Sequence, residues 1–198
     1  MKDNNKNFAP NEQLQVIQEM IEKTKRDSVK NSWPMLMWGW LILISCFSVY
    51  AIYFAGFPKL SWLPWSVFMP LGGIAHFIME LKKHKTQRIV SYAEKSIGWI
   101  WIGCGSAMFI ISFIAPASGI ISWEAIAPLI ILIIGIGSLA TAQIIQWNFL
   151  FYCSLVWWVT AVATMFIDPF FHNLIFGSIV IFTYLVPGYI MRSKYNRA

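Results

Sequence analysis

Long runs of apolar residues alternate with short polar connections along this chain. A helix needs about 20 predominantly apolar residues to cross a hydrocarbon core of about 30 Å. Six runs approach or exceed that length, at residues 35–56, 62–80, 97–116, 125–145, 148–167 and 171–191. Because backbone polar groups in hydrocarbon must bond internally, and the runs lack the alternation of barrel strands, they predict helices. The predicted fold is all-α, an integral membrane bundle of six transmembrane helices over residues 35–191.

The segment ahead of the first run, residues 1–34, has a different pattern. Within residues 11–30, Leu14, Ile17 and Ile21 share one helical face and the charges lie opposite. This pattern predicts a cytoplasmic amphipathic helix that precedes the bundle. Such a helix either lies along the bilayer or the bundle's own cytoplasmic face, or offers a docking or dimerising surface to a partner.

Composition agrees with lipid as the solvent of most of the chain. Hydrophobic residues make up 58% and charged residues 12% of the sequence, against about 45–50% and 25% in ordinary soluble domains. The net charge of +6 is accounted for by the distribution of basic residues about the membrane, so we predict no nucleic-acid partner.

The basic residues predict the orientation. Fourteen of the fifteen Lys and Arg residues lie before the first run, between the second and third, or after the last. If every run crosses the membrane, these segments lie on one side, and only Lys59 lies on the other. Basic residues favour the cytoplasmic side, which places both termini, including the basic tail 192–198, in the cytoplasm. The connection between the fourth and fifth runs has no charge, so these two runs could instead form a re-entrant hairpin. That alternative leaves the predicted side of both termini unchanged.

A cluster of basic residues follows the second run. Each basic residue near an anionic leaflet contributes about 1 kcal/mol of attraction. We therefore predict that the cluster contacts anionic headgroups on the cytoplasmic side of the lipid bilayer, with an acidic partner as the alternative. Its members are Lys82, Lys83, Lys85 and Arg88.

The best candidate for an intramembrane polar site is the pair His76 and Glu80. The two residues are four apart near the cytoplasmic end of the second run, so a helix places them on one face. An ionisable residue inside a span is a functional candidate by default, here as a proton relay or a ligand site. The structural alternative is a neutral histidine that packs between helices beside a glutamate that reaches water.

The cysteines and the other histidines do not form a recognisable reactive site. Cys46, Cys104 and Cys153 all fall within apolar runs without CxxC spacing, which predicts packing residues rather than disulfides or a redox motif. Two histidines that could flank a haem, His76 and His172, would lie roughly 20 Å or more apart by helix rise. We predict no catalytic residue, no cofactor and no metal site.

A serine-protease arrangement within the membrane is also rejected. A serine nucleophile needs its base within hydrogen-bond reach. Ser138 lies about two-thirds of the way across its run, whereas His172 lies at the outer edge of another, so the two would be roughly 20 Å apart. The chain is therefore not predicted to be an enzyme.

Several small or bulky residues predict how the helices pack. Trp157 and Trp158 fall in mid-span and point in different directions, so at least one should pack between helices. Pro187 is expected to bend the last span. Small residues suit close packing within the bundle or between subunits; they are Gly72, Gly73, Gly98, Gly103, Gly105 and the stretch 135–140.

Several stretches together resemble a group of small membrane proteins, without an assigned activity, that is common in Bacteroidota. They are NEQLQVIQEMIEKTKR followed by WGWLILI, then GGIAHFIMELKKHK, and finally YLVPGYIMRSK. The resemblance covers nearly the whole chain and implies a bacterial inner-membrane location and a six-span plan. It implies no activity.

Two functional hypotheses follow. The first is a non-enzymatic membrane protein with an interaction or regulatory role, acting as a homo-oligomer or with a membrane partner, through the N-terminal helix and the basic loop. The second is a small transporter or channel for an uncharged or lipophilic solute, with a weakly polar path near His76.

Overall fold

The computed structural model describes residues 32–86 and 92–195. The predicted amphipathic helix over residues 11–30 and the basic residue Arg88 lie outside this described part. Of the described residues, 89% are helical and none lies in a strand. The all-α prediction is therefore confirmed.

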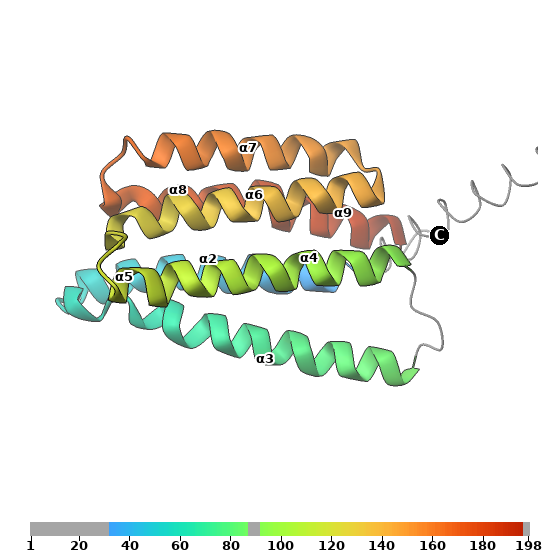
Figure 1. Ribbon diagram of the computed structural model, residues 1–198, viewed down its shortest axis with the longest axis horizontal. Coiled ribbons are helices and arrows are strands. Elements are labelled where there is room, and N and C mark those ends of the chain that lie inside the picture. The colour runs from blue at the N-terminus through green and yellow to red at the C-terminus, as the bar shows by residue number, and fades with distance from the viewer. Residues whose placement is uncertain (1–31, 87–91, 196–198) are drawn as a thin grey trace, which may run out of the picture.

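The described chain consists of long helices joined by short turns (Figure 1). The principal helices are α2 (Trp33–Phe54), α3 (Leu63–Thr86), α4 (Tyr92–Phe109), α6 (Ile126–Ile145), α7 (Asn148–Thr164), α8 (His172–Val180) and α9 (Val186–Tyr195). The shorter elements are η1 (Pro58–Leu60), η2 (Ile110–Ile114), α5 (Ala115–Ala117), η3 (Trp123–Ala125), η4 (Pro169–Phe171) and η5 (Ile181–Leu185).

Five helical stretches in this part of the chain are long and apolar enough to cross a membrane. They are Trp33–Phe54, Pro58–Lys82, Tyr92–Ala117, Trp123–Ile145 and Pro169–Ser193. The remaining apolar helix, α7, has 17 residues, or about 26 Å at 1.5 Å per residue, which is the short end of the range for a span. Each predicted run thus coincides with a helical stretch.

Two of these stretches contain a π-helical turn just ahead of a proline. The η2 turn lies between α4 and α5 and precedes Pro116, and the η5 turn lies between α8 and α9 and precedes Pro187. Proline lacks the N–H that the carbonyl four residues earlier would accept, so the helix widens locally and bonds five residues back. The backbone N–H of Ala115 and Val186 accordingly donate to Ile110 and Ile181. At Pro187, where the sequence predicts a bend, the structure has a π turn just ahead of the proline.

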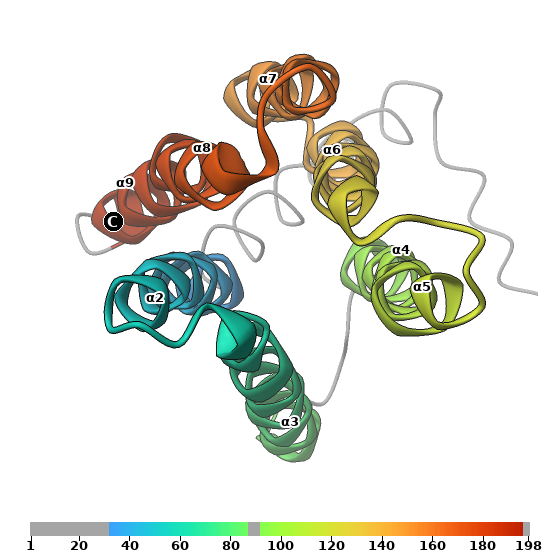
Figure 2. The ribbon, with the colours of Figure 1, turned by 90° about the vertical axis from the view of Figure 1, so that its left-hand side faces the viewer.

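The helices run side by side, so that alternate connections lie at opposite ends of the bundle (Figure 1). The start of α2, the end of α3, the start of α4, the α6–α7 turn and the end of α9 all lie at one end. Viewed along the helices, α2, α8, α7, α6 and α4 follow one another around the bundle, and α3 lies outside α2 (Figure 2). The ends that the charge pattern assigns to the cytoplasm thus share one end of the molecule.

The core lies where α2, α6, α7 and α8 meet. Trp157 of α7, Ile131 of α6 and Val180 of α8 are each 0% exposed and belong to one cluster of buried residues. The prediction that at least one of the paired mid-span tryptophans packs between helices is confirmed. Trp158 packs beside Gly135 of α6, where the absence of a side chain lets α7 approach closely.

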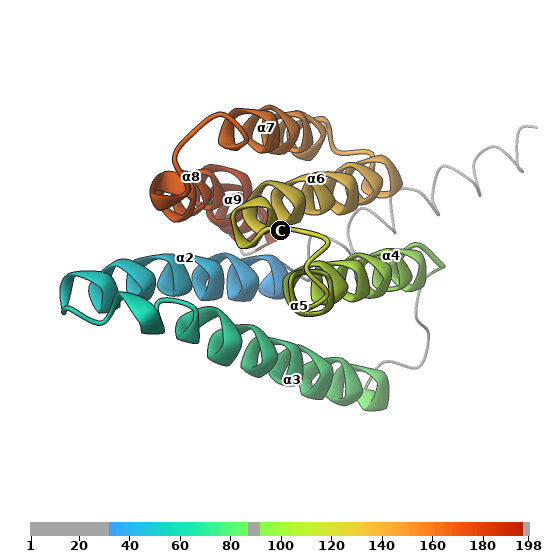
Figure 3. The ribbon, with the colours of Figure 1, turned by 60° about the vertical axis from the view of Figure 1, so that its left-hand side comes forward.

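Packing is uneven between the two halves of the bundle. Nine of the 20 residues of α6 are buried, whereas Cys104 is the one buried residue among the 18 of α4. The described side chains of α3 are similarly open, with Pro64 and Gly72 as their buried members. Figure 3 shows α3 diverging from α4. These two helices therefore present most of their apolar surface outwards.

Candidate functional site

His76 lies in the interface between α3 and α2. Its ring is half-buried, with its centroid 6.3 Å from that of Trp38 on α2. One turn earlier, a Cβ atom added to Gly72 would lie 2.6 Å from Leu41 Cδ1. The glycine therefore permits close approach of α3 to α2, and His76 packs on an indole just beyond that contact.

Glu80 follows His76 by one turn and is also half-buried. Its neighbour Met79 accepts a hydrogen bond from Trp33 Nε1 at 2.7 Å, which makes a further contact between α3 and α2. The structure thus places His76 on the contact between α3 and α2, with Glu80 one turn further along α3 near the predicted cytoplasmic end. In the described part of the chain, no three His, Cys, Asp or Glu side chains gather closely enough to hold a metal ion.

The predicted headgroup-binding cluster continues on the helix that carries His76. Helix α3 extends to Thr86, six residues past the expected end of the span at residue 80. Lys82 is exposed on this extension. The side chains of Lys83 and Lys85, and all of Arg88, fall outside the described part, so their contact with headgroups stays a prediction.

Several hydroxyl groups within the apolar helices bond to their own helices. Ser106, Thr141 and Thr160 each donate to the carbonyl oxygen four residues earlier, at 2.9, 2.7 and 2.7 Å. A hydroxyl whose proton is held by its own helix leaves only lone pairs to accept from other groups. Thr141 uses one of them to accept from Trp101 Nε1 at 3.1 Å, which joins α4 to α6. These groups therefore stabilise helices and helix contacts.

The structure keeps Ser138 and His172 apart, as predicted. Ser138 lies beside Tyr184, which is 12 residues, or about 18 Å by helix rise, beyond His172 on the α8–α9 stretch. The Nε2 atom of His172 lies 3.0 Å from the carbonyl oxygen of Ile167. A serine nucleophile and its base are therefore not assembled here.

The three cysteines are buried free thiols, in agreement with their predicted location inside the spans. Cys46 belongs to the main core cluster on α2. Cys104 lies beside Gly137, and Cys153 packs with Ala142 and Leu150. Small polarisable side chains of this kind fill gaps between helices.

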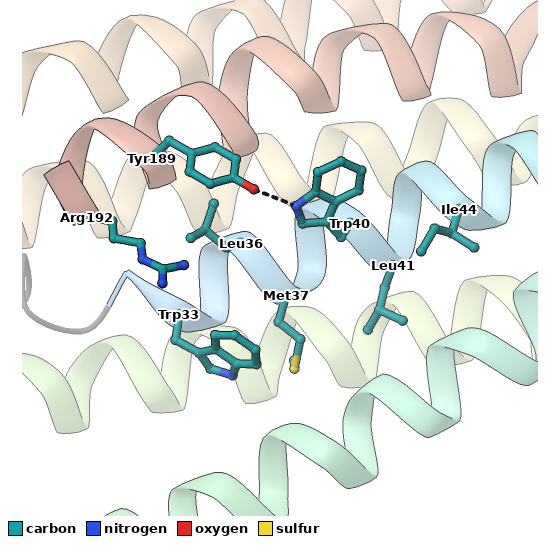
Figure 4. A pocket seen from close by; sticks show the side chains of 8 residues that line it. All are labelled: Trp33, Leu36, Met37, Trp40, Leu41, Ile44, Tyr189 and Arg192. Atoms are coloured by element: carbon teal, nitrogen blue, oxygen red, sulfur yellow. Dashed lines mark hydrogen bonds between the residues drawn. The ribbon is translucent and has the colours of Figure 1, made fainter.

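The structure also has a groove between α2 and α9 that the sequence did not predict. It lies on the outer side of α2 against α9 and has a volume of about 290 Å³ (Figure 4). Its lining residues are Trp33, Leu36, Met37, Trp40, Leu41, Ile44, Tyr189 and Arg192. Helical spacing of the α2 members was visible in the sequence, but nothing there indicated that α9 lies beside them.

No protein-family model, curated protein or solved structure matches this chain. The functional conclusion therefore rests on the residues and the geometry of the chain itself.

Proposed function

We propose that this chain is a six-span protein of the bacterial inner membrane, with both termini in the cytoplasm and a non-enzymatic interaction or regulatory role. Five long apolar helices support the membrane location. Helix α6 has 20 residues, about 30 Å, and α7 runs beside it along the bundle, which favours two crossings over a shallow hairpin. The basic residues near the ends of the spans favour the orientation.

The uneven packing of the bundle is the observation that supports the proposed interaction role. Gly98 and Gly103 are exposed on α4, and a Cβ atom added at either would meet nothing within 4 Å. Both glycines of α6, by contrast, are covered, since Trp158 packs on Gly135, and Trp101 and Cys104 pack on Gly137. Exposed small residues on a membrane helix allow the backbone of another helix to approach. We therefore assign the open surface of α4, which these two glycines mark on different sides of the helix, to a helix of a second copy or of another membrane protein.

The transport hypothesis gains no support from the same region. His76 packs against Trp38 rather than into the groove described above. A path through the bundle would have to pass the core around Trp157 and Ile131, which are both 0% exposed. Liposomes containing the purified protein are the direct test of solute movement.

Leucine at Gly98 and Gly103 together should weaken association by roughly fivefold or more, since contacts of this kind in membranes contribute about 1–2 kcal/mol. Association is measured by affinity capture from detergent extracts after crosslinking in intact membranes. Differently tagged copies of the chain report self-association, and mass spectrometry of the captured material reports other membrane proteins.

Ala163→Leu is the matched control, because Ala163 is a small exposed residue on α7, which α6 separates from α4 (Figure 2). It should leave the captured set unchanged. An unchanged set for the Gly98 and Gly103 variant as well would contradict the assignment to α4. Deletion of residues 1–30 tests the N-terminal helix as the other contact surface, and an unchanged set after both changes would count against the interaction role as a whole.

A further inference from the structure

The groove between α2 and α9 has an apolar wall along one face of α2. Trp33, Met37, Trp40 and Ile44 follow one another at intervals of four, three and four residues, which places them on one helical stripe. Trp33, Trp40 and Ile44 are 49%, 46% and 44% exposed. The described residues thus leave about half of the surface of these three side chains open.

The length of the stripe matches the depth of one leaflet. Trp33 and Ile44 are eleven residues apart, which is about 17 Å along the helix axis. Half of a hydrocarbon core of about 30 Å is about 15 Å. A stripe that starts at the cytoplasmic end of α2 therefore reaches the middle of the bilayer.

The end of the groove at the predicted cytoplasmic side is polar. Tyr189 and Arg192 lie three residues apart on α9, so both face the groove. Trp40 Nε1 donates to the Tyr189 hydroxyl at 3.1 Å, which ties α9 to α2 at this end (Figure 4). The guanidinium of Arg192 presents a planar set of donors that suits a phosphate group. One cationic group therefore stands at the mouth of an apolar groove.

We propose that this groove binds an anionic phospholipid of the inner leaflet. Its phosphate contacts Arg192 and one acyl chain lies along the α2 stripe towards Ile44. The inference rests on the proposed membrane location and orientation, and it is independent of the role assigned to α4. It adds a defined lipid site to the basic cluster on α3, which is predicted to contact headgroups only.

The chemistry of the groove favours a lipid over a helix from a protein partner, because its apolar wall ends at the cationic side chain of Arg192. A single acyl chain is narrower than a helix and needs no polar partner along its length. The charge at one end and apolar side chains along the rest match the chemistry of an anionic lipid.

Native mass spectrometry of the full chain tests the proposal with phosphatidylglycerol and phosphatidylcholine of the same acyl chains. The wild-type protein should bind phosphatidylglycerol more tightly, and Arg192→Gln should weaken this binding roughly tenfold through loss of charge-assisted hydrogen bonds. Binding of phosphatidylcholine should change little. Lys59→Gln, which removes a cation at the opposite end of the bundle, should leave both affinities unchanged.

Arg192→Lys serves as a second variant, because it keeps the charge and should retain most of the preference if the glutamine variant folds poorly. Glycerol 3-phosphate carries a phosphate without acyl chains and should not displace bound phosphatidylglycerol. Equal binding of the two lipids by the wild-type protein, or an unaltered preference in the glutamine variant, would overturn the proposal. Displacement by glycerol 3-phosphate at lipid concentration would also overturn it, because the apolar stripe would then contribute nothing.

Discussion

Replacing Trp157 by alanine is expected to destabilise the bundle by about 3 kcal/mol, at the lower end of the range for large aromatic residues in packed cores. The side chain is 0% exposed, and its ring lies edge-on to Phe176 and Tyr184 with centroids 5.7 and 5.8 Å apart. In a membrane the unfolded helices remain in lipid, so the loss comes from the cavity and the lost contacts rather than from transfer to water.

Unfolding in mixed micelles with increasing SDS, followed by circular dichroism, measures this loss. Trp99→Ala is the matched control, because Trp99 is 64% exposed on α4 and should cost far less. Trp157→Phe should lie between the two: it keeps an aromatic ring, and the Nε1 atom that it removes has no hydrogen-bond partner among the described residues. Equal losses for the Trp157 and Trp99 alanine variants would show that Trp157 is not at the centre of the core.

Replacing Gly135 by leucine is expected to separate α6 from α7 and to reduce the free energy of unfolding by about 1–3 kcal/mol or more. A Cβ atom at this position would collide with the indole ring of Trp158 and lie 3.2 Å from Trp157 Cβ. Leucine is favoured over glycine in helices by close to 1 kcal/mol in water, so a net loss of stability must come from the collision.

Gly103→Leu is the control for this substitution, because nothing lies within 4 Å of the corresponding Cβ position. The same SDS titration should show wild-type stability or a slight gain for that variant. If the Gly135 variant also retains wild-type stability, the close approach of α6 and α7 around this glycine is wrong. If the Gly103 variant unfolds early, its surface is occupied within the bundle and cannot receive a partner.

The position of each helix could be predicted from the sequence because lipid imposes a minimum length on every apolar run. The first expected span, residues 35–56, became α2 at Trp33–Phe54, and the fourth, 125–145, became α6 at Ile126–Ile145. The second expected span ended at residue 80, but α3 continues to Thr86. Hydropathy indicates where the apolar residues end, whereas a helix continues for as long as its backbone hydrogen bonds continue.

Helix neighbours could not be predicted, because the same residue types serve inside and outside the bundle. Gly135 and Gly103 look alike in the sequence, yet one is covered by tryptophan and the other is open. In lipid, apolar side chains suit both a core and a surface, so hydrophobicity does not distinguish the two. The groove at Arg192 depends on α9 lying beside α2, which no local pattern indicates.

The sequence predicted which residues form the candidate polar pair, but not what surrounds them. A helical spacing of four placed His76 and Glu80 on one face, and both are half-buried in the structure. The sequence left open whether His76 faced water or another helix. Its contact with Trp38 favours the structural alternative, and this contact depends on Gly72 allowing α3 to approach α2.

Cysteine accessibility tests the central claim, that these helices thread the membrane with their basic ends in the cytoplasm. Single cysteines replace Lys59, Lys83 or Gln146 in a chain whose three native cysteines are changed to alanine, and spheroplasts are treated with a membrane-impermeant maleimide. The cysteine at position 59 should react in intact spheroplasts, and those at 83 and 146 only after lysis. Reaction at position 83 or 146 before lysis would contradict the account.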